Sequence, residues 1–423
     1  MKKVGISFRI NEINCLKKSK IFYIIILFYI LICIINNFYN INQINQNNRF
    51  NELKNNLQII LKNLNNSLYI DYINACKALK IYNNRVKIKN KYPFLSICIS
   101  VYNSEKYIKK AILSIINQSF QDFEIIIIND YSNDNTSDII KQLKNEDSRI
   151  IVINHKKNYG TYYSRVEGVL NSRGKYILFV DPDDLILNPY LFEVLYNYYK
   201  YFNLDIIEFT VYHQIEAKNL IFYPKNHYFN HNHNFSKKII YQPELSDIIF
   251  YHPRTKKYST VICRTIWNKL FKKEVMLKTI NYIGNDYLKN QYIIIVEDTI
   301  LNLINFHFGN NYTNINLPGY LYNIRKSSIT QKKNNRESII KISISFFLYY
   351  KLLFRYIKEF NKDRNYYFYE LMFFGSEINK LKKYNIKNYS YNASIMFKEI
   401  MIDKKSPTNL KNYIKKNYNL FLN

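Results

Sequence analysis

Residues 174–184 read GKYILFVDPDD, a run of apolar strand formers that ends in three aspartates within four positions. A short apolar run of this kind is typical of a strand buried on both faces of a sheet. Similar runs occupy 95–100 (LSICIS), 123–129 (FEIIIIN), 150–154 and 204–209. We therefore predict a strand at 176–180 and one at each of these four positions.

Segments with the apolar spacing of helices separate these strands, at 104–119, 136–145, 162–171 and 189–201. Ile108, Ile112 and Ile115 recur along one helix face of the first segment, and Thr136 can cap the second. Strands that alternate with single helices predict an α/β fold with a mainly parallel sheet and helices on both faces. Ligands of such sheets bind beyond the carboxyl ends of the strands.

The residues at these strand ends indicate the chemistry of the site. Tyr102 follows the first strand, Asp130 the second, and Asp181, Asp183 and Asp184 the fourth. A GxGxxG motif and a P-loop lysine are both missing after these strands, which argues against a dinucleotide or P-loop site. Neighbouring carboxylates raise each other's pKa, and a divalent cation with oxygen ligands, Mg²⁺ or Mn²⁺, removes that cost. The alternative is an ordinary DPDD turn before the next helix.

In their order and spacing, these motifs resemble the inverting family 2 glycosyltransferases, which have the GT-A fold. The first half of the resemblance rests on SVYN (100–103), IIIINDYSNDNT (125–136), the 158–165 stretch and GKYILFVDPDD. RTIWNKL (264–270), VED (296–298), and YLYNIR with SIT (320–330) resemble the acceptor half of bacterial-type members. The resemblance covers about residues 93–330 and implies a nucleotide-sugar-binding half at 93–210 and an acceptor-binding half at 211–330.

For the donor, the resemblance implies a UDP-sugar. Tyr102 is expected to stack on the base with Ser100 beside it, and Asp130 to accept the imide N–H of uracil. Arg165 is expected to reach the base or the diphosphate, and Asp181 to bind ribose or sugar hydroxyls. Asp183 is expected to ligate the Mn²⁺ or Mg²⁺ ion, with Asp184 in a supporting role. Arg325 is expected to contact the diphosphate. A surface position is the alternative for Arg325.

For catalysis, the resemblance implies direct displacement with a carboxylate general base, which is expected to be Asp298. Glu297 is expected to contact the donor sugar or the acceptor. The alternative is that both acids only place favourable charge at the start of an apolar helix. Trp267 is expected either to stack on the acceptor sugar or to pack in the core. The QxxRW signature of processive members is absent, so transfer of single sugars to a glycan, glycoprotein or glycolipid hydroxyl is expected.

Residues 21–48 carry no charge, and 21–35 are an unbroken apolar run that reaches the length of a membrane span when extended to 39. Lys and Arg dominate the residues before the run, so the positive-inside rule places residues 1–20 in the cytosol. The sequence therefore predicts a single-pass type II protein of the Golgi or endoplasmic reticulum, with a signal anchor at 21–39, a stem at 40–92 and a lumenal catalytic domain. A cleaved signal peptide and a buried helix are the alternatives.

The composition limits the remaining function classes. The 61 Lys and Arg exceed the 32 Asp and Glu by 29, but Lys, Asn, Ile and Tyr are over-used from end to end, which favours a solvated surface over a nucleic-acid groove. Five scattered cysteines are typical of neither a disulfide framework nor a zinc site. Residues 331–423 are expected to be helical, with an amphipathic packing helix at 339–353. The alternative functions are an inactive glycosyltransferase-like binding protein and a basic nucleic-acid-binding protein.

Overall fold

The computed structural model describes residues 91–215, 220–222, 239–242, 245, 265–284, 296–325, 336–360, 362, 379, 383 and 387–418. All of them belong to the second of two structural units, Leu68–Asn423. The predicted cytosolic tail, the anchor and nearly all of the stem lie outside the described residues. Within the described ranges, no helix combines the length and the apolar character that crossing a membrane requires.

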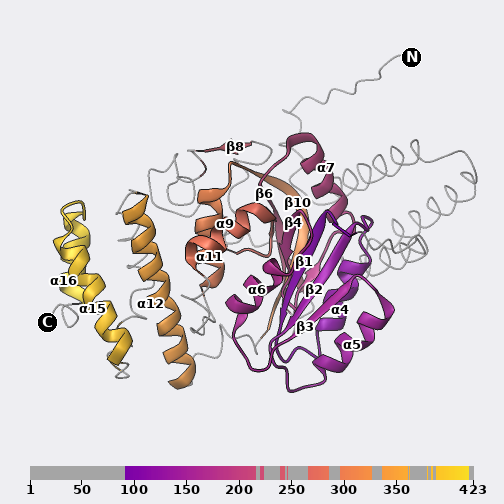
Figure 1. The fold of residues 1–423 in the computed structure, drawn as a ribbon, viewed down its shortest axis with the longest axis horizontal. Helices are drawn as coiled ribbons and strands as arrows, with labels where there is room; N and C mark the ends of the chain where they lie inside the picture. Colours follow the sequence, from indigo (N-terminus) through magenta and orange to yellow (C-terminus); the bar gives the residue numbers. More distant parts are fainter. Residues whose placement is uncertain are drawn as a thin grey trace, which may run out of the picture. The chain divides into compact units, whose positions relative to one another are not determined.

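The strand–helix alternation predicted for residues 95–209 is present. The strands are β1 (Leu95–Val101), β2 (Phe123–Asn129), β3 (Ile150–Asn154), β4 (Tyr176–Phe179) and β6 (Ile206–Ile215). The helices between them are α4 (Ile108–Ile116), α5 (Thr136–Glu146), α6 (Thr161–Leu170) and α7 (Leu191–Phe202). The first four strands are parallel in the order β3-β2-β1-β4, with α6 against one face and α4 and α5 on the other (Figure 1). Every residue of β2 is buried, as its apolar sequence predicts.

The second half of the sheet is mixed, so the expectation of a mainly parallel sheet is wrong there. Strand β9 (Lys269–Lys272) lies antiparallel between β4 and β6. Strand β10 (Asn311–Ile324) runs parallel to β6, and the short β5 (Leu185–Ile186) runs antiparallel to β10. Two further short strands, β7 (Leu220–Phe222) and β8 (Ile240–Tyr241), pair antiparallel with β6 and β10. Because β9 contributes few apolar residues between lysines, its own sequence did not indicate that it completes the sheet.

The start of α5 differs from the prediction in one detail. Thr136 is the first helical residue and not the cap, and Asn135, the residue before it, makes no side-chain capping hydrogen bond. Instead the Asp134 carboxylate accepts the backbone N–H of Thr136 at 3.1 Å and that of Glu105 at 3.1 Å. Asp134 therefore ties the loop after β2 to the loop after β1.

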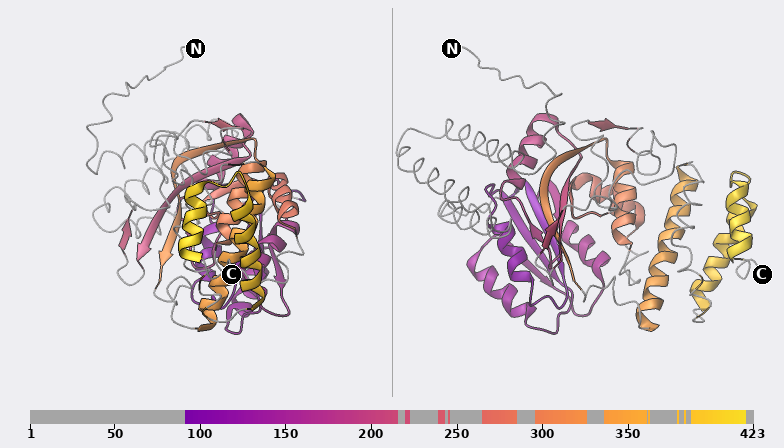
Figure 2. Two further views of the ribbon diagram at one scale, coloured as in Figure 1. Left: turned by 90° about the vertical axis from the view of Figure 1, so that its left-hand side faces the viewer. Right: turned by 180° about the vertical axis from the view of Figure 1, so that it is seen from behind.

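The described part of the region after residue 330 is helical, as predicted. Its first helix, α12 (Arg336–Glu359), packs on α11 (Glu297–Phe308), which itself packs on α9 (Lys273–Ile283). Helices α15 (Lys387–Ile402) and α16 (Thr408–Tyr418) follow, each in contact with the helix before it (Figure 2). The 339–353 segment lies within α12 and buries aromatic side chains that include Phe347, Tyr349 and Tyr350.

Gly319 lies at an irregularity of β10 and keeps that strand close to its neighbours. A Cβ atom at this position would lie 2.4 Å from the buried ring of Phe209 and 3.0 Å from a methyl group of Leu191. We therefore expect Gly319→Ala to lower the free energy of unfolding by about 1–3 kcal/mol. Chemical denaturation of the two proteins measures this difference. Gly168→Ala is the control: its Cβ would lie 3.1 Å from the Cys98 side chain, so a smaller loss is expected, and an equal loss would contradict the packing argument.

Candidate functional site

The predicted polar residues meet at one edge of the sheet. Strand β1 lies parallel to β2 and to β4, so the carboxyl ends of all three strands point the same way. Tyr102 follows β1, Asp130 follows β2 and the 181–184 loop follows β4. This shared edge is the candidate site, and β10 and α11 from the second half of the chain complete it.

Asp184 holds the 181–184 loop to β10. Its carboxylate is buried and accepts a hydrogen bond from the Tyr320 hydroxyl at 2.9 Å and from the backbone N–H of Asn323 at 2.8 Å. The backbone N–H of Asp181 donates to the same Tyr320 hydroxyl at 3.0 Å. Burial, with Asp183 and Asp181 nearby, raises the pKa of Asp184 well above its ordinary value. These contacts give Asp184 a supporting position in the loop, while a direct contact with the donor stays a prediction.

Asp183 is paired with Arg325. The Arg325 guanidinium contacts the Asp183 carboxylate and lies over the ring of Tyr107, 4.4 Å from its centroid. Burial and the neighbouring charge of Asp181 raise the pKa of Asp183 to about 6, although Arg325 opposes this shift. A carboxylate in this position favours a cation beside it. Arg325 therefore lies inside the candidate site, next to the residue expected to ligate the metal ion, and not at a remote surface.

Arg165 joins carboxylates from the two halves of the chain. It is 5% exposed on α6; its Nη2 lies 2.8 Å from Asp181 and its Nη1 lies 3.0 Å from Glu297 and also contacts Asp298. Burial disfavours the charged guanidinium, but the three carboxylates outweigh it and raise the pKa of Arg165 further. We call these four residues the Arg165 cluster. The contact of Arg165 with the base or diphosphate stays a prediction, because here its donors serve these carboxylates.

Glu297 and Asp298 form the first turn of α11. Burial raises the pKa of Glu297 to about 7, with Arg165 opposing and Asp298 adding to the shift. Burial also raises the pKa of Asp298, again against the effect of Arg165. Val296, directly before the pair, has φ 63°, a backbone conformation that is strained for a β-branched residue by roughly 1–3 kcal/mol. Two acids with raised pKa values next to strained backbone are typical of a functional site.

The residues expected to bind the base differ in exposure. Tyr102 is 46% exposed, so its ring is free to stack on a flat ligand, and Ser100 is half-buried at the end of β1. Asp130 is buried, and its carboxylate already accepts the backbone N–H groups of Tyr159 at 2.7 Å and Gly160 at 2.8 Å. Its expected contact with uracil stays a prediction.

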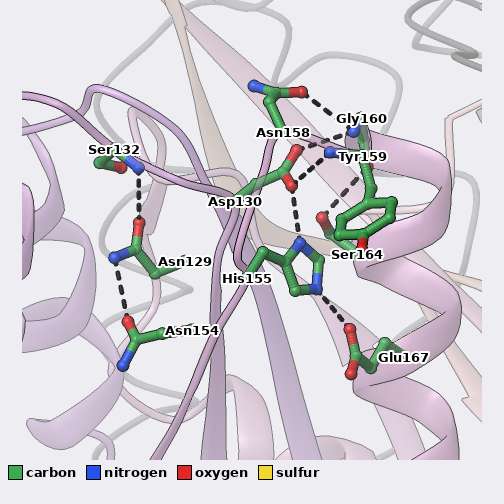
Figure 3. A network of polar contacts seen from close by, with 10 residues as sticks. All are labelled: Asn129, Asp130, Ser132, Asn154, His155, Asn158, Tyr159, Gly160, Ser164 and Glu167. Carbon is green, nitrogen blue, oxygen red and sulfur yellow. Dashed lines mark hydrogen bonds and ion pairs between the residues drawn. The ribbon is translucent and has the colours of Figure 1, made fainter.

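His155 is a residue of this edge that the sequence analysis missed. It follows β3, and its ring lies between the carboxylates of Asp130 and Glu167 (Figure 3). The Nδ1 atom lies 2.7 Å from Asp130, and the Nε2 atom contacts Glu167 on α6. The signal in the sequence was weak, because a single histidine before two lysines resembles ordinary loop composition.

Trp267 lies in the core of the second half of the sheet, beside β10. It is 3% exposed, and its indole stacks with the rings of Tyr320, at 4.5 Å between centroids, and Tyr322, at 5.5 Å. The structure thus places it as packing that supports Tyr320 and, through Tyr320, the 181–184 loop. With so little surface exposed, the indole offers no platform for a sugar in this arrangement.

The aspartates after β4 are the residues that would hold the expected metal ion. Among the residues that the structure describes, no three or more His, Cys, Asp or Glu side chains gather to hold a metal ion by themselves. Arg165 contacts Asp181, β10 holds Asp184, and Arg325 is the present partner of Asp183, so a metal ion at Asp183 would lie beside that guanidinium or replace it. One carboxylate together with substrate phosphates and water is a donor set typical of Mg²⁺.

Comparison with known families gives matches to the part of the chain that carries this edge. Residues 96–276 match the family model described as glycosyl transferase family 2. The glycosyltransferase GlyA of Streptococcus pneumoniae is 27% identical over 240 residues, which are 56% of this chain and 31% of that protein. The cholesterol galactosyltransferase of Borreliella burgdorferi is 30% identical over 230 residues, 53% of this chain and 60% of that protein. The matched part of the chain thus spans between about a third and three fifths of the length of these relatives.

Solved structures with a similar arrangement include residues 1–349 of Staphylococcus aureus TarS. That structure has 16% sequence identity and a TM-score of 0.42, and the match covers 61% of this chain and 72% of the other. The same protein in complex with UDP-GlcNAc gives a TM-score of 0.43 at 17% identity, over 62% of this chain and 72% of the other.

Proposed function

We propose that this protein, whose residues 96–276 match the glycosyl transferase family 2 model, transfers a single sugar from a UDP-sugar to an acceptor hydroxyl with inversion at the anomeric carbon. The observation that supports this proposal most is the Arg165 cluster. It brings Asp181, at the end of β4, together with Glu297 and Asp298, at the start of α11, although these acids lie more than a hundred residues apart. Inverting transfer needs such a pairing of a donor site with a general base.

In the proposed reaction, Asp298 takes the proton of the acceptor hydroxyl while the hydroxyl oxygen forms a bond to the anomeric carbon. The bond from that carbon to the donor phosphate breaks on the opposite side, and the diphosphate leaves with the electron pair. Asp298 is partly exposed at 20%, so an acceptor can reach it, and its raised pKa makes it a stronger base than an ordinary aspartate. Glu297, with a pKa of about 7, can keep a proton near neutral pH and donate a hydrogen bond to a sugar oxygen.

For the donor, we propose that Asp183 holds Mn²⁺ or Mg²⁺ together with the diphosphate. When bound, such an ion supplies positive charge beside the leaving diphosphate. Arg325 lies next to Asp183 and can contact the same phosphates. What supports uridine as the base is that the buried Asp130 and the exposed Tyr102 follow the neighbouring strands β2 and β1, as the resemblance implies. The acceptor that we propose is a hydroxyl of a glycan, a glycoprotein or a glycolipid.

The test is a screen of UDP-sugars with the purified full chain, with Mn²⁺ or Mg²⁺ and with a chelator. We expect turnover of one donor that requires the metal, and we expect Asp183→Ala to lose this response because the carboxylate that holds the ion is gone. Asp138→Ala, an exposed acid on α5, is the matched control and should keep the wild-type response. Turnover that is indifferent to the chelator would contradict the metal, and no turnover of any donor would contradict the enzyme.

We also propose that residues 21–39 anchor the protein in the membrane of the Golgi or endoplasmic reticulum, with the catalytic domain in the lumen. The support is the uncharged apolar run and the Lys and Arg residues before it. Protease digestion of sealed microsomes tests the orientation, because a lumenal domain is protected until the membrane is permeabilised.

A further inference from the structure

His155 lies between two carboxylates from different elements. Its ring is 4% exposed, with Nδ1 2.7 Å from the buried Asp130 and Nε2 in contact with Glu167, which is 26% exposed. Its backbone N–H donates to the carbonyl of Asn129 at 2.9 Å, which fixes the main chain of His155 at the end of β2. Figure 3 shows the three side chains in one line, from the end of β2 to α6. We call this arrangement the His155 bridge.

The His155 bridge needs a charged imidazolium. A neutral imidazole has one N–H and one lone pair, so it can donate to one carboxylate and must turn its lone pair toward the other. Both ring nitrogens face carboxylate oxygens here, and only the protonated ring donates to both. A proton on Glu167 would also relieve the contact, but an ordinary glutamate loses its proton at a lower pH than an ordinary histidine. The geometry therefore places the proton on His155.

The groups around the ring agree with this assignment. The charged side chains that contact it are Asp130 from the β2 end and Glu167 from α6. The rings of Tyr159 and Tyr163 lie 5.0 and 5.5 Å from it between centroids, and the ammonium of Lys157 lies over the Tyr159 ring. Burial works against the charge, but the hydrogen bonds that the ring donates to the two carboxylates, together with their negative charge, outweigh it and raise the pKa of His155.

The His155 bridge holds the helix that carries the Arg165 cluster. Asp130 accepts the backbone N–H of Gly160, which has φ 89° and directly precedes α6. Glu167 lies on the same helix, two residues after Arg165. Asp130, at the end of β2, thus contacts the start of α6 directly, and through His155 it is also linked to Glu167 further along the same helix.

We infer that charged His155 is a positioning residue for the donor: by bridging Asp130 and Glu167 it sets the orientation of the Asp130 carboxylate and the place of α6, from which Arg165 reaches Asp181 and Asp298. This inference rests on the proposed function. It says that donor binding depends on the protonation of a residue that does not itself touch the donor. Donor affinity therefore falls as the pH rises through the pKa of His155, because the neutral ring loses one of its two links.

The test measures the affinity of the full chain for UDP by calorimetry between about pH 6 and about pH 8.5, the range in which a histidine titrates. For wild type we expect an affinity about tenfold weaker at the upper end, after correction for the ionisation of UDP, which is the same for all variants. His155→Gln makes one link at most, so we expect weak binding at every pH. In Glu167→Gln the amide donates to the lone pair of the neutral ring, so we expect strong binding that no longer depends on pH.

Two further readouts separate a positioning role from a purely structural one. The ring protons of His155 in NMR spectra should titrate above the ordinary range near 6.5 in wild type and lower in Glu167→Gln. His307→Gln, which changes a histidine at the far end of α11, should keep the wild-type pH dependence. UDP binding that is the same in wild type and His155→Gln at each pH would overturn the inference, as would a His155 that titrates at or below its ordinary value. If wild type bound no UDP at any pH while His155 still titrated high, the proposed donor would be wrong and the His155 bridge itself would stand.

Discussion

Asp298→Asn should lower kcat by about 10³-fold or more while the affinity for the donor stays within a few-fold of wild type. The amide has nearly the same shape as the carboxylate but cannot take the proton of the acceptor hydroxyl, and a general base contributes about 10²–10⁴-fold to such a rate. Donor contacts on the opposite side of the site remain. Single-turnover rates with a saturating UDP-sugar, together with calorimetry of UDP, measure the two effects separately.

The control for this variant is Asp138→Asn, which removes an exposed carboxylate from α5 and should leave both quantities unchanged. The pH profile adds a second check. Asp298 acts as a base only when it has lost its proton, so kcat should fall as the pH drops through the raised pKa of the Glu297 and Asp298 pair. Transfer by Asp298→Asn at a rate near wild type would show that another group is the base.

Arg165→Lys should lower kcat by about 10²-fold, although the charge is kept. The guanidinium uses Nη2 for Asp181 and Nη1 for Glu297 and Asp298, whereas one ammonium on a flexible stem cannot serve both directions. The general base would then be held less firmly beside the donor, and misplacement by about 1 Å can cost this much. Steady-state kinetics of the two proteins measure the loss.

Arg173→Lys is the matched control for this change. Arg173 also uses two nitrogens, at 2.8 and 2.5 Å, on the buried Glu124, but it lies at the end of α6 away from the candidate site. We expect it to lose some stability and to keep kcat. If both lysine variants lost activity equally, the effect of Arg165 would be one of general stability and not of position.

Arg165→Met measures how much Arg165 contributes to stability, apart from its role in positioning the general base. It leaves three carboxylates without their cation, which costs about 3–5 kcal/mol of unfolding free energy when such a group is buried. Carboxyl groups with a raised pKa bind protons more readily in the folded than in the unfolded chain. The loss should therefore be smallest at acidic pH and grow as the pH rises. Denaturation at two pH values checks this sign.

The sequence predicted the first half of the sheet well because its signals are local. In β2, four isoleucines in a row can be satisfied only by burial on both faces, and the structure buries all of them. The helical spacing of the isoleucines in α4 and the aspartates directly after β4 are local signals of the same kind, and both could be recognised from a few neighbouring residues. Since the carboxyl ends of parallel strands lie at one edge, the sequence predicted that Tyr102, Asp130 and Asp183 belong to the same edge of the sheet.

The second half could not be predicted because its pairings are not local. Strand β9 owes its place to β4 and β6 on either side, and its own sequence indicates neither partner. Trp267 was a candidate platform for a sugar until the structure placed it against Tyr320 and Tyr322. A side chain's type shows what it can contact, and its neighbours decide what it does contact.

By itself, the sequence determined where the chain alternates between strand and helix and which acids stand at the strand ends, since both depend on a few consecutive residues. The tertiary structure alone decided that Arg165 serves three carboxylates from two distant segments and that His155 lies between Asp130 and Glu167. The physical reason is that the charge state and orientation of a buried side chain depend on groups that come near it only when the chain has folded.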